Sequence, residues 1–299
     1  MTETAIRLKG VSRSFGPTLA LSDITLDVPR DSITGLLGRN GAGKTTLMSL
    51  IAGHDRPGSG TVRVFGENPF ENAAVDSRLS FLRDNQRYPD DLTLTHALRI
   101  APRFHAAWSA ELAAELVAAF RLPARIDVRK FSRGQLSSLG IVLGLASRAE
   151  VTIFDEPYLG LDATARRIFY DALLRDYAAH PRTMLISTHL IDEMEAIFES
   201  VIVVEAGRVV LAAGVEEALA SAYTVSGPAA VVLAQVEGRK ILHTHRVGGL
   251  AAVTIAGRLL PAEAAAARER GLETAAASLQ ELVATYGSVD TTTDSEARS

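Results

Sequence analysis

Residues 35–46 read GLLGRNGAGKTT, and few folds accommodate a segment of that kind. Within it, Gly38 to Thr45 fit the pattern G-x-x-x-x-G-K-[ST] of a phosphate-binding loop. The apolar run SITGLL at 32–37 precedes the loop, and residues 43–53 follow it with apolar side chains at helical spacing. The sequence therefore predicts a glycine loop between a buried strand and a helix, which is the context that phosphate binding requires.

The residue types of this loop have a chemical reason. Glycines lack a Cβ, so successive backbone N–H groups can turn inward around phosphate oxygens, and the next helix adds its positive end. Lys44 supplies a point charge for the β- and γ-phosphates, and Thr45 offers a hydroxyl to Mg²⁺. The loop alone predicts a bound phosphate and leaves open what the phosphate is used for.

A second motif, VTIFDE at 151–156, reads as a buried strand that ends in two acids. Ligands of open α/β sheets bind at the carboxyl ends of the strands, so both carboxylates are expected at that edge. Adjacent residues of a strand point to opposite sides and can therefore serve different roles. We expect Asp155 to hold Mg²⁺ and Glu156 to polarise the attacking water as a general base.

Composition excludes several classes of protein. The chain has no cysteine, which excludes disulfides, thiolate chemistry and Cys-ligated zinc. A net charge of −4 gives no overall basic field, so no nucleic-acid partner is expected. The stretch 218–236 lacks charge but contains polar residues and Gly227-Pro228, which favours a helix end, a strand and a second helix over a membrane span. With no signal peptide at its N-terminus, the chain is predicted to be cytosolic.

The length of 299 residues suggests about two domains. Strand-like and helical segments alternate up to about residue 215, which predicts an α/β core with parallel strands. The composition then changes, and 223–287 reads as a small α/β accessory domain, with His243 and His245 on one face of a strand. Because no third metal ligand lies nearby, we expect a polar strand face there rather than a metal site. The polar end, 288–299, is predicted to be disordered.

Between the two phosphate-site motifs, residues 131–135 read FSRGQ, which is similar to the L-S-G-G-Q signature of ABC ATPases. Residues 155–162, DEPYLGLD, resemble that family's D-E-P-T-S-G-L-D run, and STH at 187–189 supplies its switch histidine. The order and spacing of the motifs match the family over roughly residues 4–215. The resemblance implies an α/β, P-loop NTPase fold of the ABC type, with a RecA-like core, an antiparallel β subdomain and a helical insert at about 88–130. By this reading the nucleotide-binding domain spans 1–215, and the accessory domain follows at 216–287.

The resemblance also implies roles for individual positions. Phe15 matches the aromatic residue that stacks on adenine, Ser132 and Gly134 match signature positions that reach a γ-phosphate, and His189 matches the switch histidine, a catalytic residue together with Glu156. Nucleotide contacts are thereby expected at the following positions: Phe15, Gly38, Arg39, Asn40, Gly41, Ala42, Gly43, Lys44, Thr45, Thr46, Ser132, Gly134, Gln135 and Asp162. Arg133 replaces the usual first glycine of the signature, and Leu159 stands where serine is usual.

One position of the family pattern is left open. The glutamine of the Q-loop should precede YPDDLT at 88–93, where the chain reads SFLRDNQR. By spacing, Arg83 or Asp84 falls nearest to the usual place, whereas Gln86 is the nearest glutamine. The resemblance thus assigns Mg²⁺ contacts to Thr45, Asp155 and either Gln86 or Asp84.

In ABC ATPases the signature of one copy completes the nucleotide site of the other. The resemblance therefore implies a head-to-tail pair, of two copies or with a related subunit, with ATP and Mg²⁺ between them. The expected function is to bind and hydrolyse ATP for a separate membrane permease, with export as the expected direction and the chain at the inner face of the membrane. Two alternatives stay open: an ABC ATPase that acts outside transport, on DNA or ribosomes, and a catalytically weak regulatory subunit.

Overall fold

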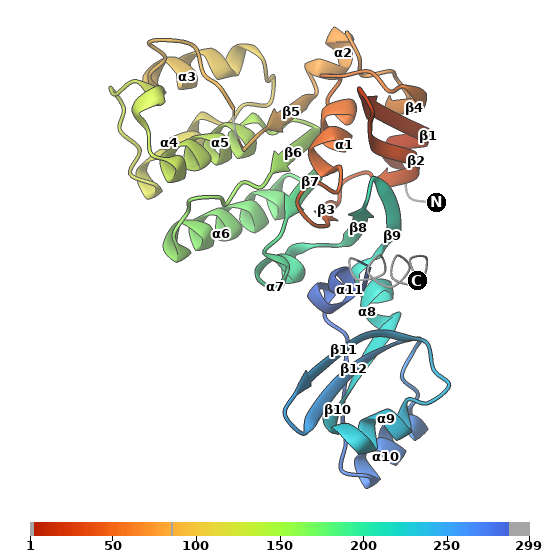
Figure 1. Cartoon of the computed structure of the whole chain (residues 1–299). Helices are drawn as coiled ribbons and strands as arrows, with labels where there is room; N and C mark the ends of the chain where they lie inside the picture. Colours follow the sequence, from red (N-terminus) through yellow and green to blue (C-terminus); the bar gives the residue numbers. More distant parts are fainter. Residues whose placement is uncertain (1–2, 85, 287–299) are drawn as a thin grey trace.

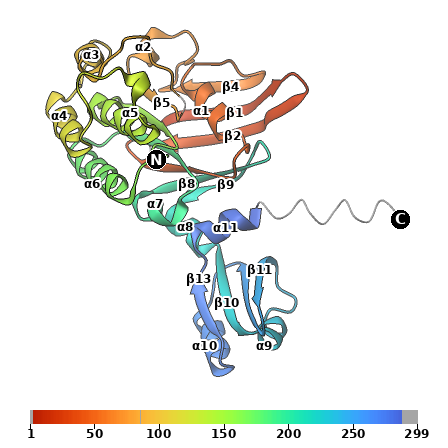
Figure 2. The ribbon, with the colours of Figure 1, turned by 60° about the vertical axis from the view of Figure 1, so that its left-hand side comes forward.

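The fold is taken from a computed structural model that describes residues 3–84 and 86–286. The described residues form three sheets, of six, three and four strands. Figures 1 and 2 show the six- and three-stranded sheets with their helices as one body and the four-stranded sheet below them, reached through α8 and α11. The tail predicted to be disordered, 288–299, lies outside the described residues.

The six-stranded sheet has the order β5-β6-β7-β3-β8-β9. Its strands are β3 (Ile33–Leu37), β5 (Leu79–Leu82), β6 (Val151–Asp155), β7 (Thr183–Thr188), β8 (Ser200–Glu205) and β9 (Arg208–Gly214). The first five strands in this order, from β5 through β3 to β8, pair in parallel. Strand β9 returns antiparallel to β8 through Ala206 and Gly207, which both have positive φ. The predicted parallel α/β core is confirmed, and the carboxyl ends of β3, β6 and β7 lie at one edge.

A three-stranded antiparallel sheet covers the start of the chain, in the order β2-β1-β4. Its strands are β1 (Thr4–Phe15), β2 (Thr18–Pro29) and β4 (Ser59–Val64). From the alternation of apolar and polar residues alone, the sequence predicts shorter strands, at 4–9 and 22–28, joined through SRSFGPT. In the structure both strands continue to a tight turn at Gly16-Pro17, and bulges beyond Leu8 interrupt the alternation of buried and exposed residues on which the prediction rested.

Helices cover both faces of the six-stranded sheet. Helices up to residue 194 are α1 (Lys44–Ile51), α2 (Ala73–Asp76), α3 (Leu94–Ile100), α4 (Ala110–Ala119), α5 (Arg133–Ser147), α6 (Ala163–Ala179) and α7 (Ile191–Met194), with 3₁₀ turns at Ala101–Arg103, Val128–Lys130 and Glu195–Ile197. Helix α1 packs between the two sheets, because Met48 shares one buried cluster with Leu8 of β1 and Ile153 of β6. The opposite face of the six-stranded sheet, which includes Phe154 of β6, packs against α5 and α6.

The helical insert consists of α3, α4 and the connections to α5, which project to one side in Figure 1. Ser109 begins α4 by accepting a hydrogen bond from the backbone N–H of Leu112 at 3.2 Å. Leu112 and Leu116 of α4 are buried against α5 in the same cluster as Phe154. The insert is therefore fixed to the core through α5, the helix that begins at the signature motif.

The four-stranded antiparallel sheet has the order β11-β12-β10-β13. Its elements are α8 (Val215–Ala220), β10 (Ala222–Pro228), α9 (Ala229–Gln235), β11 (Ile241–Val247), β12 (Leu250–Ala256), α10 (Pro261–Glu269), β13 (Glu273–Ala276) and α11 (Leu279–Tyr286). Helices α9 and α10 pack on one face of this sheet. Leu279 and Leu282 of α11 belong to the large core cluster, so α11 joins the sheet to the main body.

The uncharged stretch 218–236 is divided among α8, β10 and α9, as the sequence predicted. Over residues 3–84 and 86–286, no helix combines the length and the apolar character needed to cross a bilayer.

Candidate functional site

The glycine loop connects β3 to α1 and is shaped by backbone conformations that side chains would not permit. Gly38 has φ +140°, and a Cβ there would lie 2.1 Å from the carbonyl oxygen of Val204. Gly43, with φ +109°, would meet Ala20 O at 2.7 Å. Because Gly43 carries no side chain to cap α1, the first N–H groups of that helix stay available to an anion.

Lys44 is buried at the beginning of α1, with only 6% of the residue exposed. Its Nζ donates to the carbonyl oxygens of Gly38 at 2.7 Å and of Arg39 at 3.2 Å. Burial lowers the pKa of Lys44, and the carboxylates of Glu156 and Asp155 oppose that shift. The loop is thus folded around its own ammonium group, which holds a positive charge where phosphates would bind.

Asp155 ends β6 and is buried beside the loop. Thr45 donates its hydroxyl to Asp155 Oδ2 at 2.9 Å, and Ser187 of β7 donates to Oδ1 at 2.8 Å. Burial raises the pKa of Asp155, although both hydrogen bonds favour the charged form. Two of the predicted metal-binding residues, Thr45 and Asp155, are therefore in direct contact.

Glu156 follows with φ +50°, a conformation that non-glycine residues rarely adopt and that is often found at functional sites. Its backbone N–H donates to Ser187 Oγ at 2.9 Å. Its Oε2 accepts a hydrogen bond from the hydroxyl of Tyr158 and lies 2.7 Å from Nδ1 of His189. Among the described residues, none donates a hydrogen bond to the buried Oε1, which lies 3.9 Å from Lys44 Nζ.

Tyr158 is a site residue that sequence reasoning did not single out. It is 2% exposed, and its hydroxyl also accepts a hydrogen bond from the backbone N–H of His189 at 2.8 Å. The available signal was the tyrosine of DEPYLGLD, which stands where the family run D-E-P-T-S-G-L-D has threonine. Ser187 likewise received no role in the sequence analysis, where the STH motif at 187–189 pointed to its histidine alone.

A cavity of about 730 Å³ lies at this edge of the sheet. Predicted site residues line it, and so do neighbours from β2 and from the loops after β5 and β6: Thr18, Leu19, Ala20, Asn40, Gly41, Gly43, Lys44, Thr45, Thr46, Asp84, Arg133, Asp155, Glu156, Leu159 and His189. An adjoining cavity of about 530 Å³ is lined by Arg39, Ala42 and Glu205, among others. The structure thus brings together the phosphate loop, both acids and the switch histidine.

The signature motif lies at the beginning of α5, where Arg133 belongs to the cavity wall. Ser132 caps the helix by accepting a hydrogen bond from Gln135 N at 3.2 Å, and Gln135 Oε1 accepts one from Ser132 N at 2.9 Å. Gly134 packs so closely against Gly160 that a Cβ would lie 2.5 Å from the carbonyl oxygen of Gly160. In the part of the chain that the structure describes, Ser132, Gly134 and Gln135 do not line the 730 Å³ cavity.

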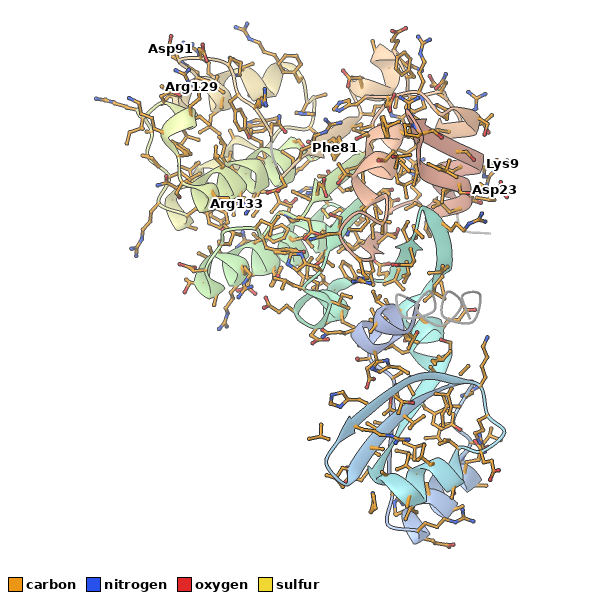
Figure 3. All side chains as sticks on the ribbon, viewed as in Figure 1. Lys9, Asp23, Phe81, Asp91, Arg129 and Arg133 are labelled. Atoms are coloured by element: carbon orange, nitrogen blue, oxygen red, sulfur yellow. The ribbon has the colours of Figure 1, made fainter. Side chains whose placement is uncertain are left out.

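Arg133 and Asp84 connect the signature to the loop that follows β5. Nη2 of Arg133 donates to both carboxylate oxygens of Asp84, at 3.2 and 3.1 Å, and both residues line the main cavity. Arg133 is the first residue of α5 and is labelled in Figure 3. Gln86 lines a smaller neighbouring cavity, which Asp84, Asp155 and Glu156 also border, and does not belong to the described lining of the main one. The geometry favours Asp84 over Gln86 as the residue that faces a nucleotide, and the assignment stays a prediction.

Two further predicted residues lie at the margin. Phe15 ends β1 with 50% of the residue exposed, and the guanidinium of Arg13 lies 4.8 Å from its ring centre while Asp55 binds Arg13 at 2.8 Å. Asp162 accepts a hydrogen bond from Ala165 N at 2.8 Å and so caps α6. Within residues 3–84 and 86–286, the lining of the main cavity includes neither of them, although Thr18, which pairs with Phe15 across β1 and β2, belongs to it.

In the accessory sheet, His243 and His245 lie on β11, opposite Thr254 and Ala252 of β12. No group of three or more His, Cys, Asp or Glu side chains suited to a metal ion occurs among the described residues.

Comparison with known proteins fits this geometry. A sequence profile described as ABC transporter matches residues 21–159. The daunorubicin resistance ATP-binding protein DrrA3 of Streptomyces coeruleorubidus is 32% identical over 216 residues, which cover 70% of this chain and 68% of the relative. The Nod factor export ATP-binding protein I of Paraburkholderia xenovorans is 31% identical over 214 residues, covering 70% of each chain.

Solved structures share the fold. An ATP-binding subunit of an ABC transporter superposes with a TM-score of 0.65 at 25% identity, covering 72% of this chain and 92% of that one. A dimeric bacterial ABC transporter cassette gives a TM-score of 0.63 at 20% identity, over 70% of this chain and 98% of its own. The predicted P-loop NTPase fold of the ABC type is confirmed. By sequence, fold and the convergence of its phosphate-site motifs, the chain belongs to the ABC transporter ATP-binding proteins.

Proposed function

We propose that this chain is the ATP-hydrolysing subunit of an ABC exporter and that it drives a separate membrane permease from the inner face of the membrane. The observation that carries the proposal is the position of Glu156 relative to the phosphate loop. Its Oε1 is free of hydrogen bonds from the described residues and lies 3.9 Å from Nζ of Lys44. A base so placed can accept the proton of a water that attacks a phosphate held by Lys44.

The remaining roles follow from the same geometry. Lys44 neutralises charge on the β- and γ-phosphates, and the N–H groups at the start of α1 bind phosphate oxygens. His189, exposed at the cavity wall, contacts the γ-phosphate. Because phosphoryl transfer needs mainly positioning and charge neutralisation, these fixed groups account for most of the catalysis that this site can supply.

The residues present fit a magnesium ion. Mg²⁺ prefers oxygen ligands and is usually held by one or two protein groups together with water and phosphate. Thr45 Oγ1 and Asp155 Oδ2 are such oxygens, and they already meet at 2.9 Å. Asp155 is 6% exposed and its hydrogen-bond donors Thr45 and Ser187 are neutral hydroxyls, so a divalent cation would supply a counter-charge for its carboxylate. Bound there, the ion would neutralise phosphate charge.

We further propose that two copies, or this chain and a related subunit, pair head to tail around ATP. Support comes from Ser132, which is exposed at the start of α5 and, like Gly134, does not belong to the described lining of its own cavity. These residues are then available to the γ-phosphate of a second copy, and ATP becomes part of the interface. Because ATP binds better to the closed pair than to the separated copies, ATP shifts the population toward the closed pair, and hydrolysis of ATP reverses this shift.

Export as the direction rests on the relatives, whose names refer to daunorubicin resistance and to Nod factor export. In this proposal residues 1–215 form the nucleotide-binding domain, and 216–287 form an accessory domain joined to it through α8 and α11. The helical insert, about 88–130, is the surface proposed to meet the permease. No nucleic-acid partner is part of the proposal.

Replacement of Glu156 by Gln tests the enzymatic part. The variant should bind Mg-ATP with unchanged affinity and lose about 10²- to 10⁴-fold in turnover, because it lacks the base. With ATP it should also accumulate as a dimer, measured by size-exclusion chromatography with light scattering. A wild-type chain without steady-state ATPase activity would favour the catalytically weak alternative. Normal hydrolysis by Glu156→Gln would remove Glu156 as the base.

The transport part has its own test. Co-expressed with a membrane protein encoded beside it, the chain should move from the soluble to the membrane fraction and be released when that partner is absent. If it stays soluble and fully active with every candidate permease, the transport role fails while the ATPase role stands.

A further inference from the structure

Tyr158 lies directly behind the proposed catalytic base. Its ring is buried in the large core cluster, 5.5 Å from the ring centre of His189 in an edge-to-face arrangement. Its hydroxyl donates to Glu156 Oε2 and accepts from the backbone N–H of His189. The phenol thus uses its proton for the carboxylate and its oxygen for the segment that carries the switch histidine, so one side chain connects both catalytic segments.

These contacts decide which way Glu156 faces. The backbone of Glu156 has a strained conformation, with φ +50°, and its side chain has several rotatable bonds, so the backbone alone does not fix where the carboxylate points. With Oε2 held by the Tyr158 hydroxyl and by His189 Nδ1, the other oxygen turns toward Lys44 and receives no hydrogen bond from the described residues. The free lone pairs of the carboxylate are therefore directed at the phosphate loop.

We infer that Tyr158 is a positioning residue for ATP hydrolysis, which holds Glu156 with Oε1 toward the water that attacks the γ-phosphate. This inference rests on the proposed function. Tyr158 acts through Glu156 rather than on the nucleotide, because it is 2% exposed and lies outside the described lining of the main cavity. No proton leaves the phenol in this role, so the chemistry of hydrolysis is unchanged.

The surroundings of the phenol favour the role of a permanent donor. Burial raises the pKa of Tyr158, and the charge of Glu156 raises it further, so the hydroxyl is protonated at neutral pH. A hydrogen bond from a neutral donor to a carboxylate in a buried setting is among the stronger kinds. The threonine of the family motif has its hydroxyl directly on Cβ and cannot reach these two partners from the same backbone position.

Replacement of Tyr158 by Phe removes the hydroxyl and keeps the ring. We expect kcat for ATP to fall by roughly 10- to 100-fold, the loss that follows from one missing hydrogen bond to a charged group. The KM and the dissociation constant of Mg-ATP should stay within about twofold, because no contact to the nucleotide changes. The measurements are steady-state ATPase and fluorescent-nucleotide binding, made with the full-length chain.

Tyr177→Phe is the matched control. The Tyr177 hydroxyl also makes two hydrogen bonds, to Asp31 O and Glu199 Oε1 at 2.6 Å each, but beside the start of β3 rather than beside the phosphate loop. Tyr177→Phe removes the same chemical group as Tyr158→Phe, a phenol hydroxyl, and should keep the wild-type kcat. Thermal unfolding of both variants separates a loss of stability from a loss of turnover.

A double-mutant cycle tests whether Tyr158 acts through Glu156. In the Glu156→Gln background, Tyr158→Phe should not lower the residual single-turnover rate further, because there is no carboxylate left to orient. An equal loss in both backgrounds overturns the inference, as does an unchanged kcat in Tyr158→Phe or a parallel loss of ATP binding. A wild-type chain that fails to hydrolyse ATP overturns the proposed function, and the inference with it.

Discussion

The hydroxyl of Thr45 donates a hydrogen bond to the carboxylate of Asp155, with 2.9 Å between Oγ1 and Oδ2. This contact joins the phosphate loop to the end of β6 across 110 residues of sequence. Asp155 is buried without a full positive counter-charge, since the donors to it, Thr45 and Ser187, are neutral hydroxyls. The site therefore maintains a buried negative charge that suits a divalent cation and lowers the stability of the metal-free protein.

Asp155→Asn should raise the stability of the metal-free, nucleotide-free protein at neutral pH by about 1 kcal/mol, a usual size for a single stabilising change. Burial raises the pKa of Asp155 above its ordinary value of 3.8. At a pH between the ordinary pKa, which applies to the unfolded chain, and the raised pKa of the folded protein, the folded state binds more protons than the unfolded state. The contribution of Asp155 to stability therefore falls as pH rises through that window. The advantage of Asn should therefore shrink as pH is lowered toward about 4.

Urea unfolding of wild type and Asp155→Asn across this pH range measures the effect. The same variant should lose the increase in melting temperature that Mg-ATP gives the wild type, because the carboxylate oxygen is gone. A variant that is less stable than the wild type at neutral pH would contradict the electrostatic part of this prediction.

Lys44→Ala should weaken ATP binding by roughly 10- to 100-fold, the value of a charge-assisted contact to phosphate. Titration calorimetry with ATP measures the change. Lys9→Ala is the control, since Lys9 is an exposed lysine on the outer three-stranded sheet, as Figure 3 shows, and should leave the affinity unchanged. Equal affinities of the Lys44 variant and the wild type would exclude Lys44 as a phosphate ligand.

Asp84 and Gln86 can be distinguished as the residue that serves the nucleotide site. Because Asp84 lines the main cavity and Gln86 lines its neighbour, Asp84→Ala should raise the Mg²⁺ concentration needed for half-maximal ATPase activity by about 2- to 10-fold. Gln86→Ala should leave it unchanged. The opposite order would assign the Q-loop role to Gln86. Stability should change little in either variant, since the ion pair of Asp84 with Arg133 is partly exposed.

Asp176 forms a buried ion cluster with Arg148 and Arg182, with N–O distances of 2.8 Å to each arginine. Asp176→Ala leaves two arginines without a counter-charge, one of them only 4% exposed, and should lower the free energy of unfolding by about 3–5 kcal/mol. Urea unfolding measures it. The matched control is Asp171→Ala on the same helix, whose carboxylate is 72% exposed and should contribute less than about 1 kcal/mol.

Several features of this protein follow from local sequence. The strand–loop–helix around Lys44 and the buried strand ending in Asp155 are confirmed in the structure. Each depends on interactions between near neighbours, such as hydrophobic periodicity and the conformational freedom of glycine. Strands β1 and β2 were predicted too short because their bulges break that periodicity, and bulges are set by pairing with another strand.

The candidate site depended on more than local sequence. Asp155, Glu156 and His189 could be named from their motifs, and the structure gathers them around Lys44 because β3, β6 and β7 are neighbours in the sheet. The contact between Arg133 and Asp84, 49 residues apart, has no local signature. The sequence also does not show which carboxylate oxygen of Glu156 receives hydrogen bonds from the described residues and which does not.

By itself, the sequence determined the elements that carry the phosphate-site motifs, the order of those motifs and the chemical groups available for phosphate. The tertiary structure decided how those groups face one another: the Tyr158 hydroxyl contacts the Glu156 carboxylate, and Ser187 joins the Asp155 carboxylate to the backbone N–H of Glu156. Of the signature, Arg133 lines the main cavity, whereas Ser132, Gly134 and Gln135 do not belong to its described lining. The physical reason is that hydrogen bonds and burial act over a few ångströms in space. Residues far apart in the chain come within that range only when the parallel sheet forms.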